Sequence, residues 1–113
     1  MKKYLAVFVA PLEAYDKMKE LMQNRTPEER EVAMNAWKTW MENHKDSIVD
    51  NGGGVGSAKR VSNDGEISDV RNEIGGYMIV QAEDADAAAS IFKDSPHRSE
   101  LDGAVEVMEI MQM

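Results

Sequence analysis

The chain has 113 residues, 42% of them hydrophobic, a length and composition that predict one folded domain, residues 1–113, with a modest core. Asp and Glu number 21 against 13 Lys and Arg, and the resulting net charge of −8 argues against nucleic acid and membrane surfaces as partners. The absence of cysteine excludes disulfides, thiolate nucleophiles and cysteine metal sites.

The first segment, MKKYLAVFVAPL, resembles a signal peptide in its two lysines and its short apolar run. Pro11 and Glu13 follow that run directly and no small-residue cleavage pattern is present, so we expect a first strand over residues 3–10 and a cytoplasmic protein. Apolar residues then recur at spacings of three and four, which predicts an amphipathic helix that stops near Asn24.

A longer helix is predicted over residues 26–48. Thr26 and Glu29 form a Thr-x-x-Glu capping box, and Pro27 suits the first helical position. One face of this helix carries small, apolar and aromatic residues and one histidine: Ala33, Ala36, Trp37, Trp40, Met41, His44 and Ile48. Such a face packs on a sheet or lines an apolar pocket.

The next stretch, VDNGGGVGSAKRV, matches neither the P-loop nor the dinucleotide fingerprint, because the required glycines and the strand-to-helix context are missing. Gly52 is expected to end the long helix in a left-handed conformation. Two interpretations of the remaining glycines stay open. They permit close packing of a helix on a strand, or they form the floor of a pocket.

The second half of the chain is predicted to be mostly strand. Residues 57–70 form a hairpin that turns at Asp64-Gly65, and residues 75–82 form a strand with Tyr77 and Met78 on opposite faces. A helix follows over residues 83–95, capped by Asp84 and ended by Pro96, before a last strand over residues 102–112. The order β-α-β-β-α-β predicts an α+β, ferredoxin-like fold.

Several segments in this order resemble a known family: TPEEREVAMNAWKTWMENHKDSIVDNGGGVG, NDGEISD, IGGYMIVQAEDADAAASIF, SPH and GAVEVMEI. Between residue 26 and about residue 110 the chain resembles YCII-related domain proteins, in particular the DGPF-domain branch. The resemblance implies a ferredoxin-like fold that dimerises through its sheets, the dimeric α+β barrel. It also implies a largely undefined activity, for which some members carry a His/Asp pair in a cleft between helices and sheet.

This sequence departs from the branch at two places. The Asp-Gly-Pro-Phe stretch is degenerate, since SDVRNEIGGY keeps only Asp69 and Glu73 of it and of the residues that follow. The histidine that some relatives carry in the middle of the long helix falls near Trp37 here. The resemblance therefore implies a shared fold more strongly than a shared catalytic site.

The candidate catalytic residues are His44 and His97, either of which could act as a general base near neutral pH, with Asp69 as the orienting carboxylate. No histidine spacing typical of a metal site is present, so we predict no metal and no cofactor. The simpler interpretation is one partly buried, hydrogen-bonded histidine and one loop histidine. The candidate ligand-binding residues are Trp37, Trp40, Gly54 and Tyr77.

Three functions remain open. The first is a homodimer that binds a small molecule between the long helix and the sheet, because apolar residues on both sheet faces need cover that one helical layer cannot supply. The second, which the resemblance to dimeric barrels implies, is a cofactor-free, isomerase- or oxygenase-like enzyme with a histidine base. The third is a protein-interaction module with no small-molecule site.

Overall fold

A four-stranded antiparallel sheet forms the centre of the computed structural model, which describes residues 1–112 and all of their side chains except those of residues 99–101. Across the sheet the strands follow the order β2 (Ile48–Gly54), β5 (Ile74–Ala82), β1 (Lys2–Val9) and β6 (Ala104–Glu109). The two central strands, β1 and β5, pair in register from Lys2 opposite Ala82 to Phe8 opposite Gly76. An α+β fold with an antiparallel sheet is thus confirmed.

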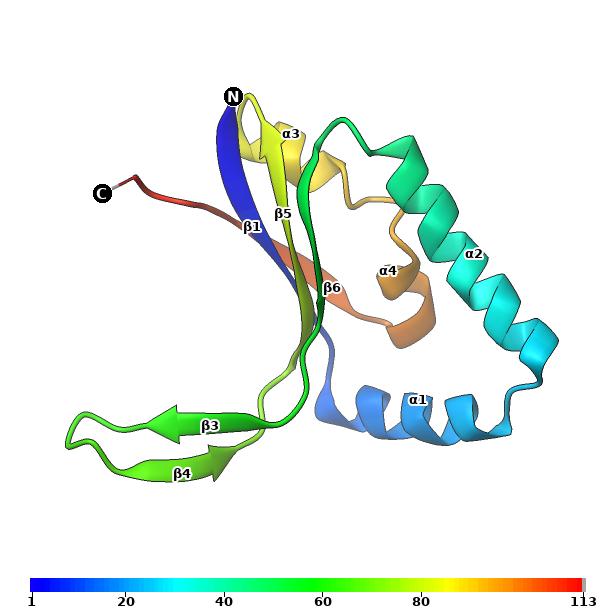
Figure 1. Ribbon diagram of the computed structural model, residues 1–113, viewed down its shortest axis with the longest axis horizontal. Coiled ribbons are helices and arrows are strands. Elements are labelled where there is room, and N and C mark those ends of the chain that lie inside the picture. Colours follow the sequence, from blue (N-terminus) through cyan, green and yellow to red (C-terminus); the bar gives the residue numbers. More distant parts are fainter. Residues whose placement is uncertain (113) are drawn as a thin grey trace.

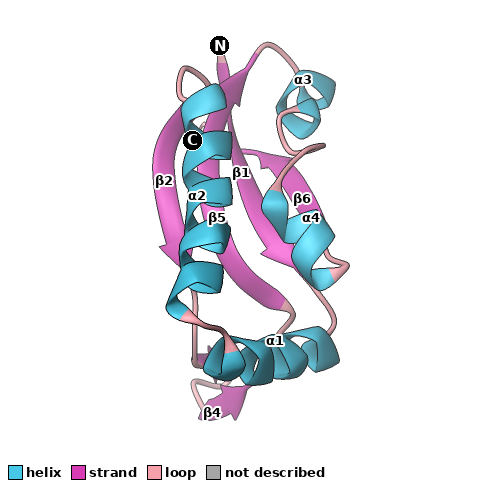
Figure 2. Cartoon of the chain, turned by 90° about the vertical axis from the view of Figure 1, so that its right-hand side faces the viewer, coloured by secondary structure: helices cyan, strands magenta, loops and turns pink. Residues whose placement is uncertain are grey.

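The helices cover only one face of this sheet. Helix α2 (Pro27–Asn43) runs along the side of β2 and β5, whereas α3 (Ala85–Ser90) and α4 (Pro96–Leu101) lie over β1 and β6 (Figure 2). Helix α1 (Leu12–Asn24) crosses the end of the sheet below α2. No helix of the described residues lies on the opposite face of the sheet (Figure 1).

Residue alternation along the central strands decides which side chains enter the core. Tyr4, Ala6 and Phe8 of β1 are buried beneath the helices, where the core also takes in Met78, Val80, Ala82, Trp40, Ala88 and Phe92. Tyr77 and Ile79 point to the helix-free face, opposite Met78 and Val80, as the sequence predicts. Through the Phe8 ring, which contacts Trp37 and Phe92, α2 and the turn after α3 pack against the same strand.

Local signals place most helix ends correctly. The Thr26 side chain accepts a hydrogen bond from the Glu29 amide and the reciprocal bond is present, so the capping box is confirmed. The long helix nevertheless ends at Asn43 rather than near residue 48, because residues 44–47 turn and Ile48 pairs with Val80 in the sheet. Asp84 caps α3 as expected, with its side chain accepting from the Ala87 amide at 2.8 Å.

Pro96 does not end a helix, and this prediction is wrong. Helix α3 stops at Ser90, residues 91–94 form turns, and Pro96 occupies the first position of α4. Proline suits that position because the amide it lacks has no helical acceptor there. A proline between two helical segments can therefore mark the end of the first helix or begin the second.

The predicted hairpin is present as β3 (Ala58–Val61) and β4 (Ile67–Val70), which pair only with each other. Its turn contains Gly65 with φ +87°, a left-handed conformation that glycine adopts without strain. Figure 1 shows the hairpin projecting from the lower end of the sheet toward the helix-free side. Among the described residues, no helix is long and apolar enough to cross a membrane.

Candidate functional site

A cavity of about 290 Å³ lies between α2 and the sheet, and we call it the inner cavity. Helix α2 contributes Trp37 and Met41, while β1 contributes Phe8. The other lining residues come from α1, from β2 and β5, and from α4: Tyr15, Asn51, Gly53, Gly54, Gly75, Gly76, Tyr77, Met78 and His97. None of these described lining residues carries a permanent charge.

The walls of the inner cavity are aromatic. The Phe8 ring meets Trp37 edge-on at 5.7 Å between centroids and meets the His97 ring at 5.3 Å, also edge-on. Edge-to-face contacts of this kind fix ring orientations and leave flat apolar surfaces for a further ring. The arrangement suits an uncharged, planar molecule held by a few polar groups at the edge of the cavity.

The glycine-rich stretch has two different roles along β2. Gly52 has φ +60°, and a Cβ at this position would overlap the carbonyl oxygen of Tyr77. It lies in β2 at a register irregularity, eight residues past His44, the C-cap of α2, so the expectation that Gly52 ends the long helix is wrong. Its left-handed conformation serves a bulge and a close approach of two strands.

Gly54 forms part of the cavity floor. It pairs with Gly76, whose missing side chain faces Phe8, so both glycines belong to the helix-covered face. A Cβ built on Gly54 meets only the Gly75 carbonyl oxygen at 3.7 Å, an ordinary contact. Packing within the chain therefore does not require glycine at position 54, and the absent side chain leaves room inside the cavity.

His97 is the histidine that lines this cavity. Its side chain lies on α4 and the residue is only 5% exposed. The Nε2 atom is 2.9 Å from the carbonyl oxygen of Val9. Gly103 lies against the same hydrogen bond, because a Cβ there would overlap Nε2 and come within 2.6 Å of the Val9 oxygen. The Val9 carbonyl, the Phe8 ring and Gly103 thus fix the position of the imidazole.

His44 belongs to a different cluster. Its Nε2 atom lies 3.3 Å from Oδ1 of Asp94, which also accepts a hydrogen bond from Trp40 Nε1 at 3.1 Å. Desolvation works against ionisation of this carboxyl, but the hydrogen bond from Trp40 and the neighbouring His44 together hold the pKa of Asp94 below its usual value. This cluster ties the end of α2 to the turn after α3, outside the inner cavity.

Tyr15 separates the inner cavity from a larger space beside it. Its hydroxyl donates toward the carbonyl oxygens of Glu73, at 2.9 Å, and Phe8, at 3.3 Å. A Cβ on Gly75 would lie 2.6 Å from this hydroxyl, so glycine there lets the phenol reach the strand ends. Desolvation, and then the negative charge of Glu73, raise the pKa of the Tyr15 phenol.

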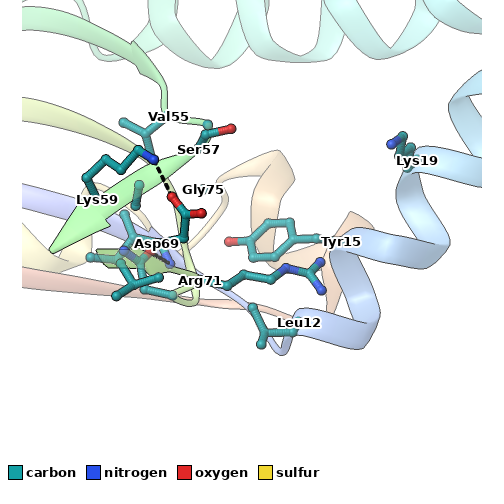
Figure 3. Close-up of a pocket in the computed structure, with 14 residues that line it drawn as sticks. Leu12, Tyr15, Lys19, Val55, Ser57, Lys59, Asp69, Arg71 and Gly75 are labelled. Atoms are coloured by element: carbon teal, nitrogen blue, oxygen red, sulfur yellow. Dashed lines mark hydrogen bonds and ion pairs between the residues drawn. The ribbon is translucent and has the colours of Figure 1, made fainter. Parts of the chain in front are cut away.

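The larger space, about 800 Å³, lies between α1 and the base of the hairpin, and we call it the outer cavity. Figure 3 shows Tyr15 and Arg71 at its wall and the ion pair between Lys59 and Asp69 on the hairpin side. Arg71 forms a second ion pair with Asp16 of α1. The cationic groups here are thus largely neutralised by neighbouring carboxylates.

The structure divides the predicted site residues into two groups. Trp37, Gly54, Tyr77 and His97 line the inner cavity together, although Tyr77 faces it with its main chain because its ring points to the helix-free face. The others lie elsewhere: Trp40 is buried in the core, His44 pairs with Asp94, and Asp69 pairs with Lys59 on the hairpin. His97 and Asp69 therefore line different cavities.

Sequence reasoning missed Phe8 and Tyr15 as lining residues, whereas Met41, on the predicted apolar face of the long helix, does line the cavity. For Phe8 the signal was available, because it alternates with Tyr4 and Ala6 on the helix-covered face of β1. Tyr15 gave no comparable signal, since its contact with Glu73 joins residues 58 positions apart. Within the described part of the chain, no group of three or more His, Asp or Glu side chains could hold a metal ion.

The family model for the YCII-related domain matches residues 8–113, which covers every residue that lines the inner cavity. No curated protein matches the chain.

Proposed function

Since the chain belongs to the YCII-related domain family, we propose that it binds an uncharged, largely aromatic small molecule in the inner cavity. The observation that carries this proposal is the floor of the cavity. Gly54 could carry a side chain without a clash inside the chain, yet it has none, and the space above it stays open between Trp37 and the sheet. Such a space suits a ligand better than it suits helix packing.

The size and polarity of the inner cavity indicate the kind of ligand. Small-molecule pockets span roughly 300–1,000 Å³, so this cavity lies at the small end and suits one or two rings. Without a permanently charged side chain in its lining, it offers no ion-pair partner to an anion or a cation. Its polar groups are Asn51, the Tyr15 hydroxyl and the His97 imidazole.

The proposal can be tested with indole as a neutral aromatic probe, followed by amide and indole N–H chemical shifts of the full chain. We expect shifts at Trp37, Gly54 and Gly76, and we expect Gly54→Ala to weaken indole binding several-fold because its methyl group occupies cavity space. Gly53→Ala is the matched control, since a Cβ there meets nothing within 4 Å and faces the opposite side of the sheet with Tyr77. Unchanged binding in Gly54→Ala, or no shifts at these residues, contradicts the proposal.

A homodimer is the second part of the proposed function. The helix-free face carries Leu5, Val7, Val9, Tyr77 and Ile79 on the two central strands, and no helix covers them (Figure 1). A second copy supplies a matching face through two-fold symmetry, which is the simplest cover for an apolar sheet face. The strand order and the single helical layer support a ferredoxin-like subunit, and pairing of two such sheets gives a dimeric α+β barrel.

An acid–base enzyme is a further candidate, favoured by the position of His97. Among the predicted bases it is the one that lines the inner cavity, so a reaction of the bound molecule would use it. Asp69 lines the outer cavity and pairs with Lys59, so His97 would act without that carboxylate. If His97→Gln loses turnover of the bound molecule but still binds indole, this function is identified. Equal turnover by His97→Gln and by the unmodified protein would exclude it.

A further inference from the structure

The hydrogen bond between His97 and Val9 determines where the imidazole carries its proton. A backbone carbonyl oxygen can only accept, so the Nε2 atom that lies 2.9 Å from it must be the protonated nitrogen. In a neutral imidazole the other nitrogen, Nδ1, then holds a free lone pair. No described residue forms a hydrogen bond with Nδ1.

The surroundings keep the ring in this orientation. The residue is 5% exposed and the Phe8 ring meets the imidazole edge-on, and a ring flip would break the hydrogen bond from Nε2 to the Val9 carbonyl. Gly103 makes the contact possible, because any side chain there would overlap Nε2 and displace it from Val9. We regard Gly103 as a positioning residue that fixes which nitrogen of His97 can meet a ligand.

We propose that the inner cavity selects ligands that donate a hydrogen bond to His97 Nδ1. This inference rests on the proposed binding function and narrows the ligand to an uncharged aromatic molecule that bears an N–H or O–H group. An isostere without the donor would bury the Nδ1 lone pair without a partner, which costs binding free energy. A carboxylate would place negative charge against the same lone pair.

The tautomer can be measured without any ligand or variant. Long-range proton–nitrogen correlation spectra of histidine-labelled protein, at about pH 8 where an ordinary imidazole is neutral, report which ring nitrogen carries the proton. We expect His97 to show a protonated Nε2 and an unprotonated Nδ1. Gly103→Ala should convert this pattern to an average of both tautomers. A protonated Nδ1, or averaging in the unmodified protein, overturns the inference.

Ligand selection is tested with indole and benzofuran, which have nearly the same shape and differ in the N–H donor. We expect the unmodified protein to bind indole at least about fivefold more tightly than benzofuran. In His97→Phe, which keeps a ring of similar size, that preference should disappear while benzofuran still binds. His44→Phe is the matched control, because His44 lies outside the inner cavity, and it should keep the preference.

The outcomes separate this inference from the function on which it rests. Equal binding of indole and benzofuran to the unmodified protein overturns the role of Nδ1 and leaves small-molecule binding intact. A preference that persists in His97→Phe also overturns it, since the selecting group then lies elsewhere. If neither probe shifts the resonances of the cavity residues, the binding function and the inference both fail.

Discussion

The indole N–H of Trp40 donates a hydrogen bond to Oδ1 of Asp94, 54 residues further along the chain. The bond joins a buried ring of α2 to the turn after α3, and His44 approaches the same oxygen at 3.3 Å. One carboxylate thus links two segments that pack on different parts of the sheet. Because this carboxylate is ionised in the bond, the link depends on pH.

We expect Asp94→Asn to remove part of the acid sensitivity of folding. The pKa of Asp94 is lowered in the folded protein, so its contribution to the free energy of unfolding is complete above the pKa of the unfolded chain. That contribution is lost as the pH falls from about 4 through the lowered value. Urea unfolding of both proteins between pH 7 and pH 3 measures this loss. If the free energy of unfolding falls equally with pH in Asp94→Asn and in the unmodified protein, the prediction is contradicted.

Gly52→Ala should destabilise the protein by about 1–3 kcal/mol or more. The residue has φ +60°, and a Cβ there would overlap the Tyr77 carbonyl oxygen, so both the backbone conformation and the neighbouring strand must adjust. Chemical denaturation gives the free energy of unfolding. Gly53→Ala, one residue away and with open space around the new methyl group, should change it by less than about 0.5 kcal/mol. Similar losses in both variants would exclude this explanation.

Tyr15→Phe should cost about 1–2 kcal/mol, because the carbonyl oxygens of Phe8 and Glu73 lose their shared donor. The raised pKa of the phenol means that this contribution is complete below the unfolded pKa near 10 and is lost as pH rises through the folded value. Unfolding curves at neutral and strongly alkaline pH test both statements. Tyr77→Phe is the control, since its ring lies on the helix-free face, 37% exposed. A larger loss in the control would count against the assignment.

Met108→Glu should convert the proposed homodimer to a monomer. Met108 pairs with Leu5 on the helix-free face and is 45% exposed in the single chain, so the subunit tolerates a charge there but a dimer would bury it. We expect sedimentation velocity to show a dissociation constant raised at least about tenfold. Val32→Glu adds the same charge on α2, at a residue 70% exposed, and should leave association unchanged. A monomeric unmodified protein would end the dimer proposal.

The sequence predicted those elements whose signals are local. The capping box at Thr26, the cap at Asp84 and the Asp64-Gly65 turn each depend on residues within a few positions, and each is present. The end of the long helix was misplaced because pairing of Ile48 with Val80 outweighs helical periodicity there. Pairing between strands that are distant in the sequence cannot be predicted from a short stretch of residues.

The candidate site was predictable in part for the same reason. Trp37 and Gly54 could be chosen by spacing and by the missing side chain, and both line the inner cavity. The pairing of His97 with Asp69 could not be judged, because strand order decides that the hairpin carries Asp69 away to the outer cavity. Likewise, the bond from His97 to Val9 joins residues 88 positions apart.

The projecting hairpin has a practical consequence. In the described residues β3 and β4 make their extended contacts with each other, and a two-stranded ribbon alone is marginally stable. Its amides should therefore exchange with solvent through local opening while the four-stranded sheet stays protected. Exposed turns of this kind accept insertions readily. A fluorescent label or affinity tag inserted between Asp64 and Gly65 would thus allow the protein to be detected or purified without altering the residues that line the inner cavity.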